Sequence, residues 1–129
     1  MTIPVPSALP STSSWAVADW LDRSWTSDPA GADGVALITL PALGDSERWQ
    51  LTHMVVGCTS SAATRARLYL DSTSNGTLRD GSNVGNFDVA DWPMGLWIPP
   101  GRSLLARWTG CTPGAVATLA VQATILRRT

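Results

Sequence analysis

The side chains with most chemical potential in this 129-residue sequence are one histidine, ten carboxylates and two cysteines. His53 lies within an apolar segment, and no nucleophile or second histidine stands near it at the spacing of a catalytic or metal-binding motif. The sequence has no Gly-x-Ser-x-Gly elbow and no phosphate-binding glycine loop. We therefore predict that the protein is not an enzyme, has no catalytic residue and needs no cofactor.

Oxygen-bearing side chains gather in one part of the sequence and raise the question of a calcium site: Asp71, Asp80, Asn83, Asp88 and Asp91. Hard cations prefer several oxygens that converge from a loop, but this spacing matches no EF-hand. Asp and Asn also favour turns, which is the explanation that we prefer. The pair Asp88 and Asp91 resembles glycosidase carboxylates only in residue type, since nothing in the sequence indicates a flanking cleft. No metal site is predicted.

Seven tryptophans are unusual for a chain of this length. Four of them lie in or beside predicted strands: Trp49, Trp92, Trp97 and Trp108. Packing in the core is the first explanation for these four, followed by burial in an interface and stacking on a sugar. The other three precede the predicted compact domain and need cover from that domain or from a neighbour. The candidate partner-binding residues are Trp15, Trp20, Trp25, Trp92 and Trp97.

The remaining pattern is that of β-strands, because polar and apolar residues alternate over several short segments. The clearest of these are residues 35–40, 48–58, 65–71, 102–109 and 115–126. Leu68 and Leu70 are expected to face the core, with Tyr69 on the solvated side. Residues 72–85 are expected to be a surface excursion. So many strands and turns predict an all-β fold, an antiparallel β-sandwich of jelly-roll type.

One turn is predicted in detail. Pro100 and Gly101 stand at the central positions of a type II turn between two apolar segments. A hairpin of two neighbouring strands is the simplest interpretation.

The N-terminal residues 1–34 differ from the rest. Three prolines in the first ten residues predict an extended arm. After a cap at Ser14, a short helix is also compatible with the sequence, because Val17, Trp20 and Leu21 have the i, i+3, i+4 spacing. We divide the chain into this arm, residues 1–34, and a β-sandwich domain, residues 35–129. Residues 1 to about 28 are expected to be dispensable for folding and to attach the protein to a neighbour; the alternative is that their tryptophans cover an open end of the same sandwich.

Charge and cysteine content narrow the class of partner and the compartment. The net charge is −1 and the basic residues are scattered, which argues against nucleic acid and membrane as partners. The N-terminus lacks the features of a signal peptide, so synthesis in the cytoplasm is expected. Cys58 and Cys111 are too few for a stapled scaffold, and whether they form a disulfide stays open.

Several short segments together resemble a known group of proteins: residues 66–71 (ARLYLD), 85–93 (GNFDVADWP), 98–101 (IPPG) and 107–110 (RWTG). Over roughly residues 35 to 126 the chain resembles small virion proteins of tailed phages that infect actinobacteria. The resemblance implies a non-enzymatic structural role in the virion, as a minor tail protein or a capsid decoration protein. It implies contacts with other virion proteins and a homo-oligomer, for which a trimer is one option. The alternative is a carbohydrate-binding module that uses Trp92 and Trp97 on a cell-surface glycan.

Overall fold

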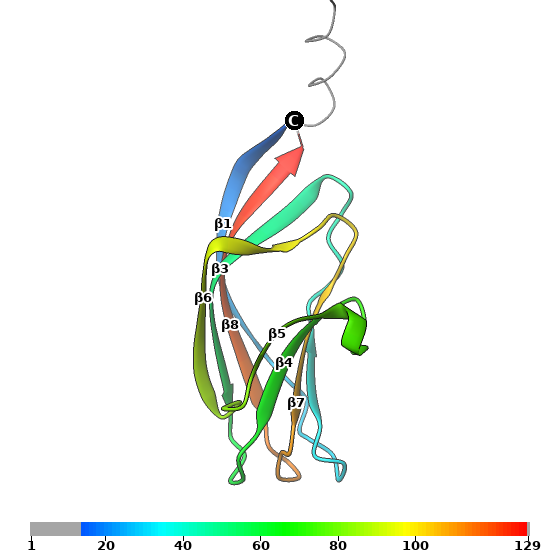
Figure 1. Ribbon diagram of the computed structural model, residues 1–129, viewed down its shortest axis with the longest axis vertical. Coiled ribbons are helices and arrows are strands. Elements are labelled where there is room, and N and C mark those ends of the chain that lie inside the picture. The colour runs from blue at the N-terminus through cyan, green and yellow to red at the C-terminus, as the bar shows by residue number, and fades with distance from the viewer. Residues whose placement is uncertain (1–13, 129) are drawn as a thin grey trace, which may run out of the picture.

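A computed structural model describes residues 14–128, which form two four-stranded antiparallel sheets packed face to face (Figure 1). The first sheet has the strand order β1-β8-β3-β6, made of β1 (Trp15–Thr26), β8 (Ala117–Arg128), β3 (Glu47–Cys58) and β6 (Phe87–Ile98). The second sheet has the order β2-β7-β4-β5, made of β2 (Ala36–Thr39), β7 (Leu104–Thr109), β4 (Arg65–Leu70) and β5 (Leu78–Ser82). A single turn of 3-10 helix, η2 (Asn75–Thr77), precedes β5. No helix of the described residues is long and apolar enough to cross a membrane.

This strand order is that of a jelly roll, in which the chain passes repeatedly from one sheet to the other and each sheet pairs strands distant in sequence. The predicted fold class, an antiparallel β-sandwich of jelly-roll type, is therefore confirmed. The core lies between the sheets. In β8 every second side chain points into it: Ala117, Leu119, Val121, Ala123 and Ile125.

The segment after Ser14 is a strand, so the predicted short helix is wrong. β1 pairs with β8 from Trp15 opposite Arg128 to Thr26 opposite Thr118. A β-bulge between Val17 and Asp19 shifts the register by one residue. Residues 15–26 of the predicted arm are thus part of the first sheet, and residues 1–13 lie outside the described residues.

The predicted turn forms, but the predicted hairpin does not. Gly101 has φ +73°, and the N–H of Arg102 donates to the carbonyl of Pro99 over 3.3 Å. However, the strand before the turn pairs with β3 in the first sheet, and the strand after it pairs with β2 and β4 in the second. The turn therefore carries the chain from one sheet to the other, because local turn chemistry does not determine which strands pair.

Gly101→Val is expected to destabilise the fold by about 1 kcal/mol or more, because a β-branched side chain is strained at positive φ. Space is not the obstacle, since a Cβ atom at this position would have its nearest neighbour, Oδ1 of Asp45, at 3.8 Å. Denaturant unfolding of both proteins measures the difference. An unchanged midpoint would contradict the strain argument.

Tyr69 and residues 72–85 also depart from the sequence pattern. Tyr69 lies on the outer side of β4 as predicted, yet it is fully buried rather than solvated. Arg107 contacts it there: its guanidinium carbon lies 5.2 Å from the ring centroid, and Nη2 donates to the Tyr69 hydroxyl over 3.0 Å. The predicted excursion contains the strand β5. This strand has few apolar residues, so an alternation of polar and apolar residues could not reveal it.

Asp71 directly follows the last residue of β4. Its contacts hold the turn at residues 99–102 against the end of that strand. Asp71 is the one non-glycine residue with positive φ in the described part of the chain. Its N–H donates to the carbonyl of Ser103 over 2.8 Å, and Oδ1 accepts from the N–H of Ser103 over 2.9 Å. Arg102 donates to Oδ2. The backbone N–H of Ser103, followed by the Arg102 guanidinium, holds the pKa of Asp71 below its usual value of 3.8.

Asp71→Asn should therefore lower the melting temperature at pH 7, and the loss should shrink as pH falls. A carboxyl whose folded pKa is depressed adds stability above its unfolded pKa, and this stability disappears as pH drops through the folded pKa. Thermal melts from pH 7 to below pH 3 measure the difference. Asn tolerates positive φ, so the variant isolates the charge. The control is Asp22→Asn, which removes an exposed carboxylate from β1; a loss independent of pH would contradict the assignment.

Candidate functional site

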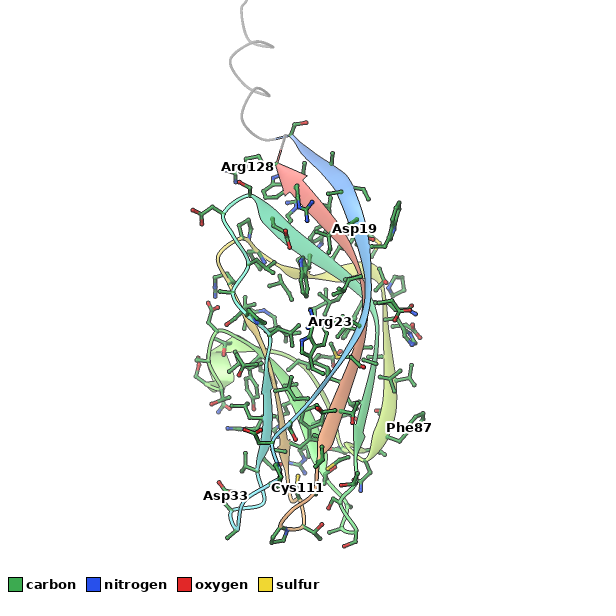
Figure 2. All side chains as sticks on the ribbon, turned by 180° about the vertical axis from the view of Figure 1, so that it is seen from behind. Asp19, Arg23, Asp33, Phe87, Cys111 and Arg128 are labelled. Carbon is green, nitrogen blue, oxygen red and sulfur yellow. The ribbon has the colours of Figure 1, made fainter. Side chains whose placement is uncertain are left out.

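The strongest candidate for a binding surface is the side of the sheet β1-β8-β3-β6 that points away from the core, which we call the outer face. Side chains on it include Val17 and Trp20 of β1, which stand opposite outward residues of β8. Phe87 and Val89 of β6 extend the same face at the other edge of the sheet. Trp20 is 74% exposed and Phe87 is 67% exposed, and Figure 2 shows Phe87 directed away from the sheets.

A tryptophan–arginine cluster lies on the outer face, at the end where Trp15 of β1 pairs with Arg128 of β8. Its members are Trp15, Arg48, Trp97 and Arg128. The guanidinium carbon of Arg48 lies 4.6 Å from the Trp15 ring centroid and 4.7 Å from that of Trp97. Arg128 lies 5.0 Å from Trp15. Each such cation–π contact is worth about 0.5–1 kcal/mol where exposed and more where water is excluded. The cluster joins β1, β3, β6 and β8, so all four strands of the sheet contribute to it.

Arg48 is held mainly by the two rings. Its Nε atom is buried and has no hydrogen-bond partner among the described residues. A buried donor without a partner is costly, so the ring faces and the rest of the guanidinium group must compensate for it.

The five predicted partner-binding tryptophans divide into two groups. Trp15, Trp20 and Trp97 lie on the outer face, and Arg48 brings Trp15 and Trp97 together. Trp25 and Trp92 are half-buried and pack against the core. The indole N–H of Trp92 donates to Oδ2 of Asp80 over 2.8 Å.

His53 has a partner that the sequence did not reveal. Its Nδ1 atom lies 2.6 Å from Oδ1 of Asp91. The two residues face each other across β3 and β6, next to a register shift, and are 38 positions apart in sequence. Pairing of opposite residues on adjacent strands is a consequence of the topology, which a single sequence does not provide. No hydroxyl or thiol in the described residues is hydrogen-bonded to this ring.

The acidic residues considered for calcium do not form a cluster. The described residues contain no group of three or more His, Cys, Asp or Glu side chains placed to hold a metal ion. Asp71 binds Arg102, and Asp91 binds His53. Asp80 and Asp88 line one cavity between the sheets.

Cys58 and Cys111 are neighbouring free thiols. Cys111 lies at the end of the sandwich opposite Arg128 (Figure 2). Burial, followed by the proximity of Cys58, raises the pKa of Cys111 to about 11. Cys111 is thus a protonated, poorly reactive thiol at neutral pH. The loop that follows Cys58 and the loop that contains Cys111 are tied together, since the N–H of Thr112 donates to Oγ of Ser60 over 3.0 Å.

The fold and the outer face define an all-β jelly-roll module with a large exposed aromatic surface. No protein-family model and no curated protein sequence matches the chain. A search of solved structures found weak similarities. The virus-like particle of the extra small virus of the giant freshwater prawn Macrobrachium rosenbergii is 11% identical, with 97% of this chain and 90% of that chain covered and a TM-score of 0.40.

Two further structures of viral origin have similar scores. For infectious bursal disease virus, Gt strain, the identity is 12%, the shares covered are 91% of this chain and 33% of that chain, and the TM-score is 0.31. For the enzymatically active domain of tailspike protein 4 of bacteriophage CBA120 the identity is 13%, the shares are 86% and 19%, and the TM-score is 0.35.

Proposed function

We propose that this protein is a non-enzymatic structural protein of a virion, and that it attaches to neighbouring virion subunits through the outer face. The observation that carries the proposal is the exposure of Trp20, Phe87 and Val17 on one sheet face. Val17 and Trp20 lie at the β1 edge of this face and Phe87 at the β6 edge. Exposed apolar side chains on one face are typical of interaction sites, and tryptophan is enriched among residues that dominate binding energy. The finer assignment, a minor tail protein or capsid decoration protein of a tailed phage, rests on the sequence resemblance.

The tryptophan–arginine cluster supports an interface with other proteins. Trp15 and Trp97 are already stacked on Arg48, so little side-chain entropy remains to be lost when a partner covers them. The same cluster supplies cationic groups that can pair with a partner's carboxylates. A homo-oligomer, including a trimer, is compatible with a rigid, self-contained sandwich that presents one such face.

The carbohydrate-binding alternative has less support from the geometry. Trp92 is half-buried, and its indole N–H is engaged by Asp80, so it does not form a platform with Trp97. Trp97 itself is 39% exposed and has a guanidinium group against its ring. A glycan array with the intact protein and Trp97→Ala tests this alternative: saturable binding that the substitution abolishes would favour it.

The test of the proposed function replaces two exposed rings of the outer face. Trp20→Ser combined with Phe87→Ser should reduce the copies per particle at least about tenfold, because each lost ring removes apolar area from the interface. Particles are purified from an infection in which the variant replaces the natural protein, and copies are counted by quantitative mass spectrometry.

The matched control is Leu37→Ser. Leu37 is also exposed, but it belongs to β2 in the other sheet and stands opposite Arg107 on that sheet's outer side. The control should enter particles normally, and both variants should melt like the natural protein. Normal incorporation of the double variant would contradict the proposal.

A further inference from the structure

A cavity of about 180 Å³ lies between the two sheets, at the edge formed by β5 and β6. Its floor is apolar and consists of Met54 and Val56 from β3 with Ala66 and Leu68 from β4. Pockets for drug-sized ligands are larger, about 300–1,000 Å³. The cavity is therefore of a size for one long side chain rather than for a large ligand.

The mouth of the cavity is acidic. Asp80 and Asp88 line it, and no basic residue in the described part of the chain does. Each carboxylate is already oriented. Oδ1 of Asp80 accepts from the N–H of Gly81 over 2.7 Å, and Oδ2 accepts from Trp92 over 2.8 Å. Oδ1 of Asp88 accepts from the N–H of Val89 over 2.8 Å, and Oδ2 accepts from the Ser82 hydroxyl.

These contacts leave both carboxylates able to bind a cation. A carboxylate has about four lone-pair sites, and each of these two uses two of them in the bonds just described. The Ser82 hydroxyl, followed by the Val89 N–H, lowers the pKa of Asp88 below its usual 3.8, so this group is anionic at neutral pH. Two fixed negative charges above an apolar floor call for a ligand that is aliphatic at one end and cationic at the other.

We propose that the cavity receives the side chain of an arginine from a neighbouring subunit, with its aliphatic stem on the apolar floor and its guanidinium group at Asp80 and Asp88. This inference rests on the proposed function, which supplies the neighbouring subunit. Arginine fits better than lysine, because a planar guanidinium with five donors can serve two carboxylates at once and is more weakly hydrated than an ammonium group. A metal ion fits less well, since the described residues place no third His, Cys, Asp or Glu side chain here.

The isolated protein tests the site with n-butylguanidinium chloride, which has the stem and the head of the arginine side chain. Saturable shifts of the Gly81, Ser82 and Val89 amide resonances are expected in two-dimensional NMR spectra. Guanidinium chloride lacks the stem and n-butanol lacks the charge, so each should bind about tenfold more weakly or not at all. Equal shifts with guanidinium alone, or no shifts with n-butylguanidinium, would overturn the inference.

Two kinds of variant test separately how the apolar floor and the acidic mouth of the cavity contribute to binding of the probe. Ala90→Leu places a larger side chain from β6 in the cavity and should abolish binding. Asp88→Asn keeps the shape of the mouth and should weaken binding about tenfold, with Asp22→Asn as the control that leaves it unchanged. A melting temperature close to that of the natural protein shows that Ala90→Leu is folded; if it is not, Asp88→Asn decides, because it fills no space.

The inference and the proposed function can fail separately. If the probe does not bind but the outer-face variant is still excluded from particles, the arginine site is wrong and the virion role stands. If the probe binds as described and the outer-face variant enters particles normally, the arginine site stands as a binding site and the interface assigned to the outer face is wrong.

Discussion

A chain that begins at Gly31 is expected to lose cooperative folding and to aggregate. Such a chain lacks β1, which pairs with β8 along its whole length. It also lacks Leu21 and Trp25, which pack against the core, and buried Ala30, whose N–H donates to the carbonyl of Ala115 over 2.8 Å. Burial of each large side chain contributes about 1.5–3 kcal/mol, and the total stability of a domain is about 5–15 kcal/mol. An uncovered β8 would also present an apolar strand edge.

The control is a chain that begins at Ser14, which keeps all the described strands. It should melt cooperatively at close to the temperature of the full chain. Circular dichroism melts and light scattering compare the three proteins. The expectation from the sequence alone, that residues up to about 28 are dispensable for folding, would be restored if the chain from Gly31 gave a soluble domain with a cooperative melt.

Trp108→Ala is expected to destabilise the protein by about 3–5 kcal/mol, a large fraction of its stability. The Trp108 ring is fully buried in the core, and its indole N–H donates to the carbonyl of Gly85 over 3.0 Å. The substitution leaves both a cavity and a buried carbonyl without its donor. Gly85 is closely packed here, because an added Cβ atom would lie 3.0 Å from Cδ1 of Trp108. Denaturant unfolding measures the loss.

Two other substitutions separate the loss of the hydrogen bond from the loss of the buried ring. Trp108→Phe keeps most of the ring volume and removes the donor, so it should cost about 1–3 kcal/mol. Trp20→Ala removes the same residue type from an exposed position and should change stability by less than about 0.5 kcal/mol. Similar losses for Trp108→Ala and Trp20→Ala would show that the assignment of core and outer face is wrong.

The sequence predicted the fold class and most of the strands, because inward residues of strands such as β8 alternate strictly. It failed at β1, where the bulge between Val17 and Asp19 breaks the period of two. Val17 and Trp20 both point outward although they are three residues apart, which imitates the spacing of a helix face. Leu21 then points inward. A bulge is a feature of the pairing with β8, so local periodicity cannot reveal it.

The candidate site was predicted only in part, for a similar reason. The sequence selected Trp15 and Trp97 by residue type, but their contact through Arg48 depends on β3 lying between the strands that carry them. The pair of His53 and Asp91 depends on the register of β3 and β6. Selection by residue type also included Trp25 and Trp92, which the fold turns towards the core. Residue type identifies candidates, whereas topology decides which of them meet.

The pairing of Trp15 with Arg128 has a consequence for the order of the strands along the chain. The two residues are opposite each other at one end of β1 and β8, so the first and last described residues leave the sandwich at the same pole (Figure 1). A circular permutant could therefore join them through a short linker and open the chain in the β3–β4 loop at the other pole. The strands would keep their neighbours, and both new termini would emerge far from the tryptophan–arginine cluster.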